Sequence, residues 1–359
     1  MKILLVRLRL IGDVVFTTPV IRALRRRYPH AHLSYLVEPS AAPIVEGNPH
    51  LDEVIVAPKP RGLARLAADV RLARTLRGAR YDVAIDLHGG PRSGWLTWAS
   101  GAPRRIGYDI KGRGWMYTSR VARAPDLRPR HSVRNQWDLL APLGISPPDP
   151  ALDAVEMGDD RHAAARVDAR LRAAGVLPGA PLVVIHVSAG NPFRRWPEAS
   201  FQALTEALVR RDPARRILLT SGPSDAEAAR QIASRAREAL GGLAAAVPDL
   251  GEFDLHELRA IIARSAAYIG GDSGPLHVAA TTTAPVVALL GPTLPERSKP
   301  WRDPRHFVEI LDHALPCRPC HQRVCEPGDF RCLTWTSADQ VIKAAERAIA
   351  AGMARGGRS

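Results

Sequence analysis

The sequence predicts an α/β protein built from two Rossmann-like, doubly wound domains. In both halves of the 359-residue chain, short apolar runs alternate with longer segments of helical periodicity, a pattern typical of parallel sheets covered by helices. Residues 146–160, rich in proline and aspartate, separate the two series. A chain of this length also exceeds one ordinary core. We therefore expect an N-terminal domain over residues 1–155, a C-terminal domain over 156–345 and a frayed tail over 346–359.

The expected elements follow in order along each half. The short apolar runs predict strands at 2–8, 32–37, 54–57, 81–87, 182–187, 216–221, 267–269 and 286–290. The periodic segments predict helices over 14–28, 63–77, 197–211, 224–240 and 255–265. In a doubly wound sheet, ligands bind beyond the carboxyl ends of the strands. The loops that follow these strands are therefore the segments where function is expected.

The formal net charge is +14, and nearly all of the excess belongs to the first half. Of the 50 lysines and arginines and 36 aspartates and glutamates, residues 1–150 hold 24 and 12, which leaves 26 and 24 for the rest. The excess fits either a general preference for arginine or a first domain that faces phosphorylated lipid headgroups, nucleic acid or an acidic sugar. No apolar run approaches the roughly 20 residues of a membrane-spanning helix, and arginines interrupt the first apolar segment, so a cytoplasmic protein is expected.

The loop after the first strand contains Gly12 and Asp13. Glycine lets the chain turn and lets a ligand come close. A carboxylate at this strand end can act as a general base on a hydroxyl group. Aspartate is equally suited to cap a helix that begins at Val14, and both interpretations stay open.

Two loops in the second half have features of anion-binding segments. SAGNPFRRWP, residues 188–197, offers small residues and then Arg194 and Arg195, which can hold a diphosphate or can be solvated surface arginines. GGDSGPLH, residues 270–277, opens a helix whose first N–H groups lack partners, although Asp272 or Ser273 can simply cap that helix. The uncharged stretch from Ser273 to Pro295 predicts burial in the domain centre.

Taken together, the motifs of this chain resemble those of glycosyltransferase family 9, the ADP-heptose:lipopolysaccharide heptosyltransferases, in particular those of type II. The blocks that carry it are KILLVRLRLIGDVVFTTPVIRALRRRYP, RYDVAIDLHGGPRSGWL followed by RRIGY, RRWPE, YIGGDSGPLHVAATTTAPVVALLGPT and CRPCHQRVCEPGDFRC. They extend from residue 1 to about residue 345. The resemblance implies the GT-B architecture, two Rossmann-like domains facing across a cleft, with the acceptor bound by the first domain and the nucleotide sugar by the second.

The implied reaction is an inverting transfer of heptose from ADP-heptose to Kdo or heptose in the anionic inner core of lipopolysaccharide. No cofactor is required, and the enzyme works at the cytoplasmic face of the inner membrane as a peripheral protein. The resemblance makes Asp13 the general base, places Gly12 and Arg92 on the acceptor side, and puts Arg194 where the family often has lysine. The implied donor-binding residues are Ser188, Gly190, Arg195, Ser224, Phe253, Asp272, Ser273, Gly274, His277 and Thr293.

The four cysteines of the chain all lie within residues 317–332. Their spacing is C-x2-C-x4-C-x6-C, formed by Cys317, Cys320, Cys325 and Cys332. Three interpretations stay open: a structural zinc or iron site, two disulfides, or free thiols in a folded loop. Four protein ligands would leave a metal no open position for catalysis.

Other functions are compatible with parts of this pattern. A GT-B enzyme could use another nucleotide sugar or a protein acceptor such as an autotransporter, and a sugar-nucleotide 2-epimerase shares the fold. A basic nucleic-acid-binding protein is the alternative outside enzymes. The sequence contains no known nucleic-acid-binding motif, so a nucleic-acid partner is not expected.

Overall fold

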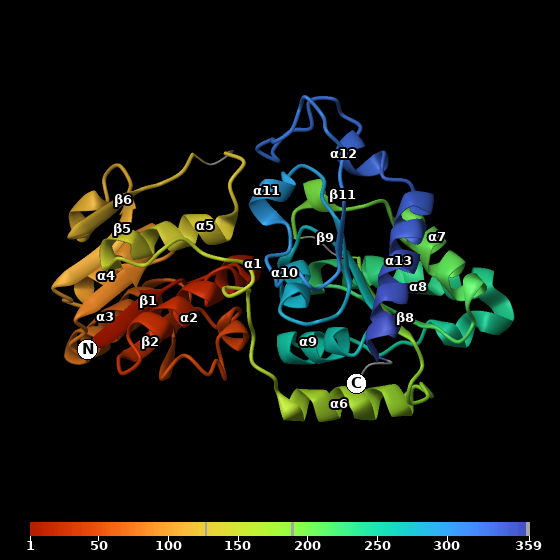
Figure 1. Ribbon diagram of the computed structural model, residues 1–359, viewed down its shortest axis with the longest axis horizontal. Coiled ribbons are helices and arrows are strands. Elements are labelled where there is room, and N and C mark those ends of the chain that lie inside the picture. The colour runs from red at the N-terminus through yellow and green to blue at the C-terminus, as the bar shows by residue number, and fades with distance from the viewer. Residues whose placement is uncertain (126–127, 188–189, 357–359) are drawn as a thin grey trace. The chain divides into compact units, whose positions relative to one another are not determined.

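A computed structural model describes residues 1–125, 128–187 and 190–356 of the chain. It divides into two compact units, Met1–Gly158 and Asp159–Ser359 (Figure 1). Each unit is a parallel sheet with helices packed against it. The predicted fold class, two doubly wound α/β units of the GT-B type, is confirmed.

The sheet of the first unit has the strand order β3-β2-β1-β4-β5-β6, and all its pairings are parallel. The first strand, β1, lies inside the sheet. β2 and β3 follow on one side of it and β4, β5 and β6 on the other, so the strand order reverses between β1 and β4. The strands are β1 Lys2–Val6, β2 His32–Val37, β3 Glu53–Val56, β4 Val83–Asp86, β5 Arg104–Asp109 and β6 Ser119–Ala122. The last two were not predicted as strands. The loops after β1 and β4 flank this reversal, where a doubly wound sheet binds ligands.

The helices of the first unit are α1 Ile11–Val15, α2 Thr18–Arg27, α3 Leu63–Gly78, α4 Pro91–Ala99 and α5 Ser132–Trp137. The single helix expected over 14–28 is therefore two helices. Pro19 has no N–H for the carbonyl of Val15, and the hydroxyl of Thr18 donates to that carbonyl instead at 2.8 Å. The backbone breaks at this point.

The second sheet has the order β11-β10-β9-β7-β8, again all parallel, and reverses between β7 and β9. Its strands are β7 Leu182–His186, β8 Arg216–Thr220, β9 Ala267–Gly271, β10 Val286–Leu289 and β11 Val308–Leu311, of which β11 was not predicted. Its helices are α6 Arg161–Ala173, α7 Glu198–Arg211, α8 Ala226–Leu240, α9 Leu255–Ala263, α10 Gly274–Ala280, α11 Pro295–Ser298, α12 Arg331–Thr334 and α13 Ala338–Gly356.

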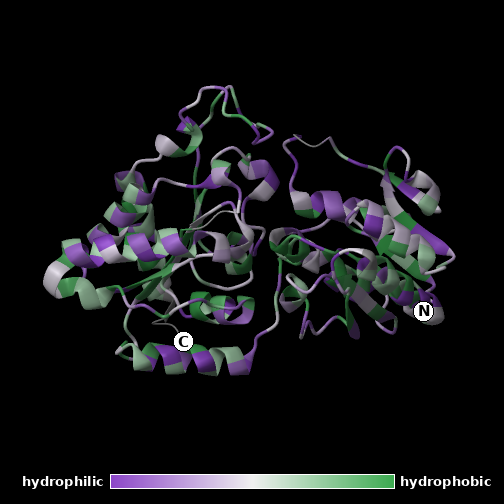
Figure 2. Cartoon of the chain, turned by 180° about the vertical axis from the view of Figure 1, so that it is seen from behind, coloured by the Kyte–Doolittle hydropathy of each residue, from purple (hydrophilic) through white to green (hydrophobic). Residues whose placement is uncertain are grey.

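Helices cover both faces of the second sheet and bury its strands. One apolar cluster joins the sheet to α7, α8 and α13, and another joins it to α6, α9 and α10. Figure 2 shows hydrophilic bands recurring along α6, whose apolar residues Val167 and Leu171 are buried. The segment expected to be a frayed tail is largely helical, because α13 continues through Gly356 and buries Ala348 and Ile349 in the first cluster. Among the described residues, no helix combines the length and apolar character needed to cross a bilayer.

Candidate active site

The loop after β1 carries Asp13, the expected general base. Helix α1 begins at Ile11, so Asp13 lies in its first turn and Leu10 is the N-cap residue. The alternative that Asp13 caps a helix starting at Val14 is therefore wrong. The helix starts earlier because Leu10 adopts a φ of 65°, a strained value for a non-glycine residue. Strain of this kind often accompanies a functional loop.

Arg7, the first residue after β1, orients the Asp13 carboxylate. Its Nη2 forms an ion pair with Asp13, and its Nη1 donates to the carbonyl of Leu87 at 2.8 Å, just beyond β4. The side chain of Arg7 is buried, whereas that of Asp13 is 30% exposed. Gly12 lies beside them in α1 and is partly exposed. The carboxylate is thus held between the two loops where the strand order reverses.

Histidine and arginine side chains that were not predicted complete this edge of the first unit. Burial, together with the charges of Arg7 and Arg9, lowers the pKa of His88 to about 4, so its imidazole is neutral near pH 7. Arg9 is exposed in the loop after β1. The edge therefore combines a carboxylate, a neutral imidazole and an exposed cation. The only sequence signal for Arg7 and Arg9 is their position at the end of an apolar run.

Arg92, expected on the acceptor side, is bound within the first unit. Its Nη1 donates to Glu38 at 2.8 Å, and its Nη2 donates to Asp69 at 2.6 Å and to the carbonyl of Pro58 at 2.7 Å. Only 12% of the side chain is exposed. These contacts tie the loop after β2 to α3 and α4. A contact between Arg92 and an acceptor stays a prediction.

Asp86, the last residue of β4, organises the loop that contains His88. Its carboxylate is fully buried and accepts hydrogen bonds from the hydroxyls of Tyr117 at 2.6 Å and Ser93 at 3.0 Å, and from the backbone N–H of Gly89 at 2.9 Å. Burial raises the pKa of Asp86, although these hydrogen bonds oppose the shift. These hydrogen bonds hold the backbone of the loop after β4 in place. Asp86 itself is buried and therefore not exposed to a ligand.

In the second unit, Arg194 and Asp272 meet where the strand order reverses. Arg194 ends a short 3-10 turn, Pro192–Arg194, in the loop after β7, and Asp272 follows β9, the neighbouring strand. Nη1 of Arg194 lies 3.1 Å from Oδ2 of Asp272. Burial alone raises the pKa of Asp272, but the imidazole of His277 and the guanidinium of Arg194 outweigh it and the pKa is lowered. The two expected site loops are therefore joined by an ion pair of which the carboxylate is 3% exposed.

The residues that follow Asp272 do not cap α10 with their side chains. Ser273 occupies the N-cap position, but its hydroxyl makes no capping hydrogen bond. The carboxylate of Asp272 lies 3.7 Å from Nε2 of His277 and interacts with the hydroxyl of Thr293, in the loop after β10. Gly274 is the first residue of α10. Of the expected donor-binding residues, the structure thus gathers these four around the ion pair.

Most of the remaining expected donor-binding residues lie on the β8 side of the second unit. One of them lies outside the residues that the structure describes. Arg195 turns away from Arg194 and pairs with Asp225 at 2.6 Å, to which the hydroxyl of Ser224 also donates. Phe253 stacks under the guanidinium of Arg170 at 4.3 Å. It lines a cavity of about 380 Å³ together with Thr220, the last residue of β8, and Ser221. Gly190 is exposed with open space around it, and Ser188 lies outside the described residues.

The four cysteines line one cavity of about 470 Å³, which also touches Phe193 and Pro292. All four are free thiols, so the two-disulfide interpretation does not describe the structure. Within the described part of the chain, no three histidine, cysteine or acidic side chains are grouped closely enough to hold a metal ion. The arrangement as it stands does not fit a four-thiolate metal site. Burial raises the pKa of Cys332 to about 11, which keeps this thiol protonated near pH 7.

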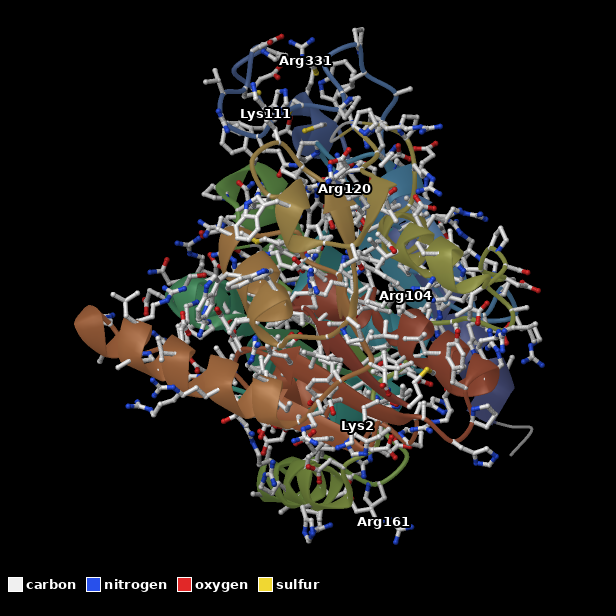
Figure 3. All side chains as sticks on the ribbon, turned by 90° about the vertical axis from the view of Figure 1, so that its left-hand side faces the viewer. Lys2, Arg104, Lys111, Arg120, Arg161 and Arg331 are labelled. Carbon is white, nitrogen blue, oxygen red and sulfur yellow. The ribbon has the colours of Figure 1, made fainter. Side chains whose placement is uncertain are left out.

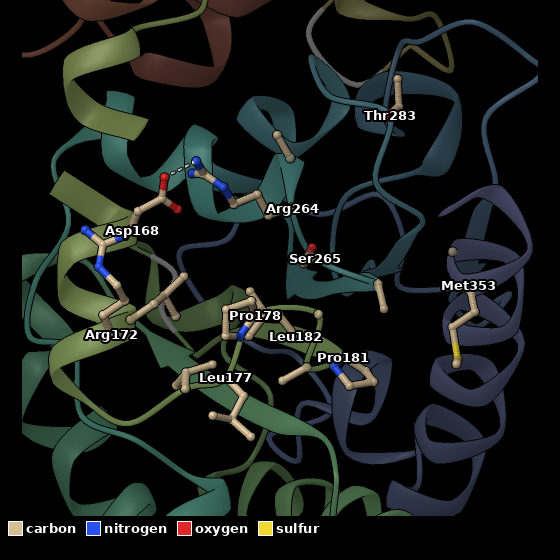
Figure 4. A pocket seen from close by; sticks show the side chains of 17 residues that line it. Asp168, Arg172, Leu177, Pro178, Pro181, Leu182, Arg264, Ser265, Thr283 and Met353 are labelled. Carbon is tan, nitrogen blue, oxygen red and sulfur yellow. Dashed lines mark hydrogen bonds and ion pairs between the residues drawn. The ribbon is translucent and has the colours of Figure 1, made fainter. Parts of the chain in front are cut away.

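A cavity of about 830 Å³ lies at the opposite edge of the second sheet (Figure 4). Pro178, Pro181 and Leu182 line it where β7 begins, and Ser265 lines it just before β9. Asp168 and Arg264 form an ion pair across its wall at 2.8 Å. The amino ends of the strands meet here, far along the sheet from the Arg194 loop. We therefore separate this cavity from the candidate active site, despite its size.

His186, the last residue of β7, predicts acid sensitivity of the second unit. It is buried, and burial lowers its pKa from 6.5 to about 4. The unfolded state therefore binds a proton first as pH falls, so the free energy of unfolding should drop by up to about 3 kcal/mol between pH 6.5 and pH 4. Urea unfolding followed across this range should show a shallower pH slope for His186→Gln than for wild type. The exposed His162→Gln is the control, and equal slopes for all three proteins would contradict the prediction.

Known proteins resemble this chain over most of its length. The model of glycosyltransferase family 9 (heptosyltransferase) matches residues 70–329. Lipopolysaccharide heptosyltransferase 3 of Escherichia coli (strain K12) is 30% identical over 299 residues, which cover 81% of this chain and 83% of that protein. Lipopolysaccharide heptosyltransferase 1 of Pseudomonas aeruginosa is 28% identical over 339 residues, with 90% and 87% covered.

Solved structures share the fold over nearly the whole chain. The glycosyl transferase family 9 protein of Veillonella parvula DSM 2008 superposes with a TM-score of 0.82 at 24% identity, covering 97% of both chains. The E. coli heptosyltransferase WaaC, solved with ADP-2-deoxy-2-fluoro heptose, gives a TM-score of 0.68 at 21% identity and covers 97% of this chain and 99% of that one. The resemblance indicated by the sequence motifs is confirmed.

Proposed function

Because the chain belongs to glycosyltransferase family 9, we propose that it transfers a heptose from ADP-heptose to a sugar of the lipopolysaccharide inner core. The main structural support is the Arg194–Asp272 ion pair. It lies where the strand order of the second sheet reverses, which is where a doubly wound fold binds its ligand. The heptose donor is supported by WaaC, whose structure holds an ADP-heptose analogue. The lipopolysaccharide acceptor is supported by the names of relatives at 28–30% identity.

In this proposal the two units divide the work. The first unit binds the acceptor, and the Asp13 carboxylate takes the proton from the acceptor hydroxyl as its oxygen attacks the anomeric carbon of the heptose. The bond from that carbon to the diphosphate oxygen breaks, the configuration inverts, and ADP leaves. Arg194, in the second unit, carries the positive charge that stabilises the departing diphosphate.

The direct test is ADP release. Wild-type protein is mixed with ADP-heptose and a core acceptor ending in Kdo or heptose, with and without EDTA. Acceptor-dependent ADP release that survives EDTA supports a heptosyltransferase that needs no catalytic metal. If EDTA abolished turnover and Mg²⁺ restored it, the proposal that catalysis needs no metal would be wrong, but the proposed heptose transfer would stand. Release from GDP- or UDP-sugars only, or transfer to a protein acceptor only, would reassign the substrate and keep the fold.

We further propose that the first unit contacts the cytoplasmic face of the inner membrane, where a lipid-linked acceptor would lie. Trp98 and Trp115 are 43% and 59% exposed and stack edge to face with ring centroids 5.7 Å apart. Residues 98–123 around them hold six lysines and arginines and one aspartate. Figure 3 shows Arg104, Lys111 and Arg120 on the side that carries β5 and β6. Exposed tryptophan beside clustered cations suits an anionic lipid surface.

Replacing both Trp98 and Trp115 with alanine should therefore weaken binding to vesicles containing phosphatidylglycerol by roughly tenfold, because the rings no longer enter the headgroup layer. Flotation of the protein with such vesicles measures the effect, and phosphatidylcholine vesicles provide the neutral comparison. Trp335→Ala, which removes a 53% exposed tryptophan of the second unit, is the matched control. Equal flotation of the double variant and wild type would remove this surface from the proposal.

A further inference from the structure

The segment that carries the cysteines reaches the candidate donor site through Gln322. We propose that Gln322 is a positioning residue, which fixes the guanidinium of Arg194 for the diphosphate of the donor. The inference rests on the proposed function, because it assigns the task of Arg194 to the donor diphosphate. It gives residues 317–332 a role at the donor site that depends neither on a metal nor on a disulfide.

Three hydrogen bonds connect the carboxamide of Gln322 to the two loops of the site. Its Oε1 accepts from Nε of Arg194 at 2.7 Å and from Nδ2 of Asn191 at 2.8 Å. Its Nε2 donates to Oγ1 of Thr293 at 3.3 Å. Both partners of Oε1 can only donate, so they define which end of the amide faces Arg194. Gln322 therefore links the loop after β7 to the loop after β10.

The backbone around Gln322 is held in an unusual conformation. Gln322 has a φ of 55°, in the left-handed region that non-glycine residues rarely occupy. Nearby, Arg318 is 3% exposed and donates to the carbonyl of Thr293 at 2.8 Å. The ring of Phe330 packs edge to face against that of Phe193, with centroids 5.3 Å apart. These contacts fasten the cysteine-bearing segment to the site loops on both sides of Gln322.

The consequence for Arg194 is a guanidinium with two nitrogens committed to the protein. Nε donates to Gln322, and Nη1 lies 3.1 Å from the Asp272 carboxylate and 3.3 Å from its backbone carbonyl. Among the residues described by the structure, Nη2 takes part in no hydrogen bond or ion pair. Because the guanidinium is planar, fixing two of its nitrogens fixes the direction of the third. Nη2 is then the donor directed at a phosphate oxygen.

The experiment compares ADP binding and turnover in a double-mutant cycle. Gln322→Ala and Gln322→Met, which keeps the volume without polar atoms, should each weaken ADP binding and lower kcat/KM by roughly 10- to 100-fold. Adenosine, which lacks the diphosphate, should bind as well as it does to wild type. In an Arg194→Ala background, Gln322→Ala should cost nothing further, because its effect passes through Arg194.

Gln231→Ala, an exposed glutamine of α8, is the matched control, and melting temperatures verify folding of every variant. Unchanged ADP affinity in both Gln322 variants, or an undiminished effect of Gln322→Ala without Arg194, overturns the inference. ADP binding by wild type without heptose transfer overturns the proposed function alone, since ADP still tests the position of Arg194. Absence of ADP binding by wild type overturns both.

Discussion

Replacing Asp13 with asparagine should lower kcat for heptose transfer by about 10²- to 10⁴-fold, the usual contribution of a general base. Asparagine keeps the size of the side chain and the approach of Arg7, but it cannot take a proton from the acceptor hydroxyl. Binding of ADP should not change, because Asp13 belongs to the first unit and the proposed donor-binding residues belong to the second. Acceptor-dependent ADP release under saturating donor measures the effect.

The control for this prediction is Asp82→Asn. Asp82 lies at the other end of the first sheet, where its carboxylate accepts from the backbone N–H of Lys2 at 2.6 Å. This variant can lose stability through that hydrogen bond, but it should keep its turnover. If Asp13→Asn retains turnover near that of wild type, Asp13 is not the base. His88, neutral and close by, would then be the next candidate to test.

Replacing Arg194 with alanine should lower kcat/KM by about 10²- to 10³-fold, because the departing diphosphate loses its charged donor. The same change leaves the buried carboxylate of Asp272 with His277 and Thr293 but without the guanidinium, which should lower the free energy of unfolding by roughly 1–3 kcal/mol. Turnover, ADP affinity and urea unfolding measure the three effects. Arg194→Lys keeps the charge but loses the planar fork, so it should recover only part of the activity.

A second substitution separates catalysis from stability. Asp272→Asn removes the charge that Arg194 no longer balances, so the double variant with Arg194→Ala should regain much of the lost stability but none of the activity. Arg210→Ala, which removes a half-exposed arginine at the far end of α7, is the matched control. Recovery of turnover in the double variant would show that Arg194 serves the fold and not the reaction.

Apolar runs buried on both faces, such as β2 and β7, were predicted as strands, since both sides of such a strand need apolar residues. The edge strand β3 was also predicted, although its residues are exposed or only partly buried. The strands that the sequence did not predict lie at or next to sheet edges. β5 includes Arg104, Arg105 and Asp109, and the residues of β11 are all only partly buried. Strands of this kind need fewer apolar residues, so they leave a weaker pattern.

The site was predictable as a set of strand-end loops but not as a set of contacts. The pairing of Arg194 with Asp272 depends on β7 lying beside β9, a neighbour that is not next in sequence. Arg7 was visible in the sequence as a charge in an apolar run. Its function as the partner of Asp13 became evident only from the structure. Gln322 carried no signal in the sequence. Its contacts with Arg194 and Thr293 depend on a left-handed backbone conformation, which the cysteine spacing does not indicate.

The strand orders of the two sheets have a consequence for how the protein is made. Each sheet takes all of its strands from one uninterrupted half of the chain, and neither borrows a strand from the other. During synthesis, the first unit can therefore complete its hydrogen-bonded sheet before β7 leaves the ribosome, as domains generally do. Within each half, the first strand to emerge is also an interior strand of its sheet, so β1 and β7 can serve as templates onto which later strands add on either side.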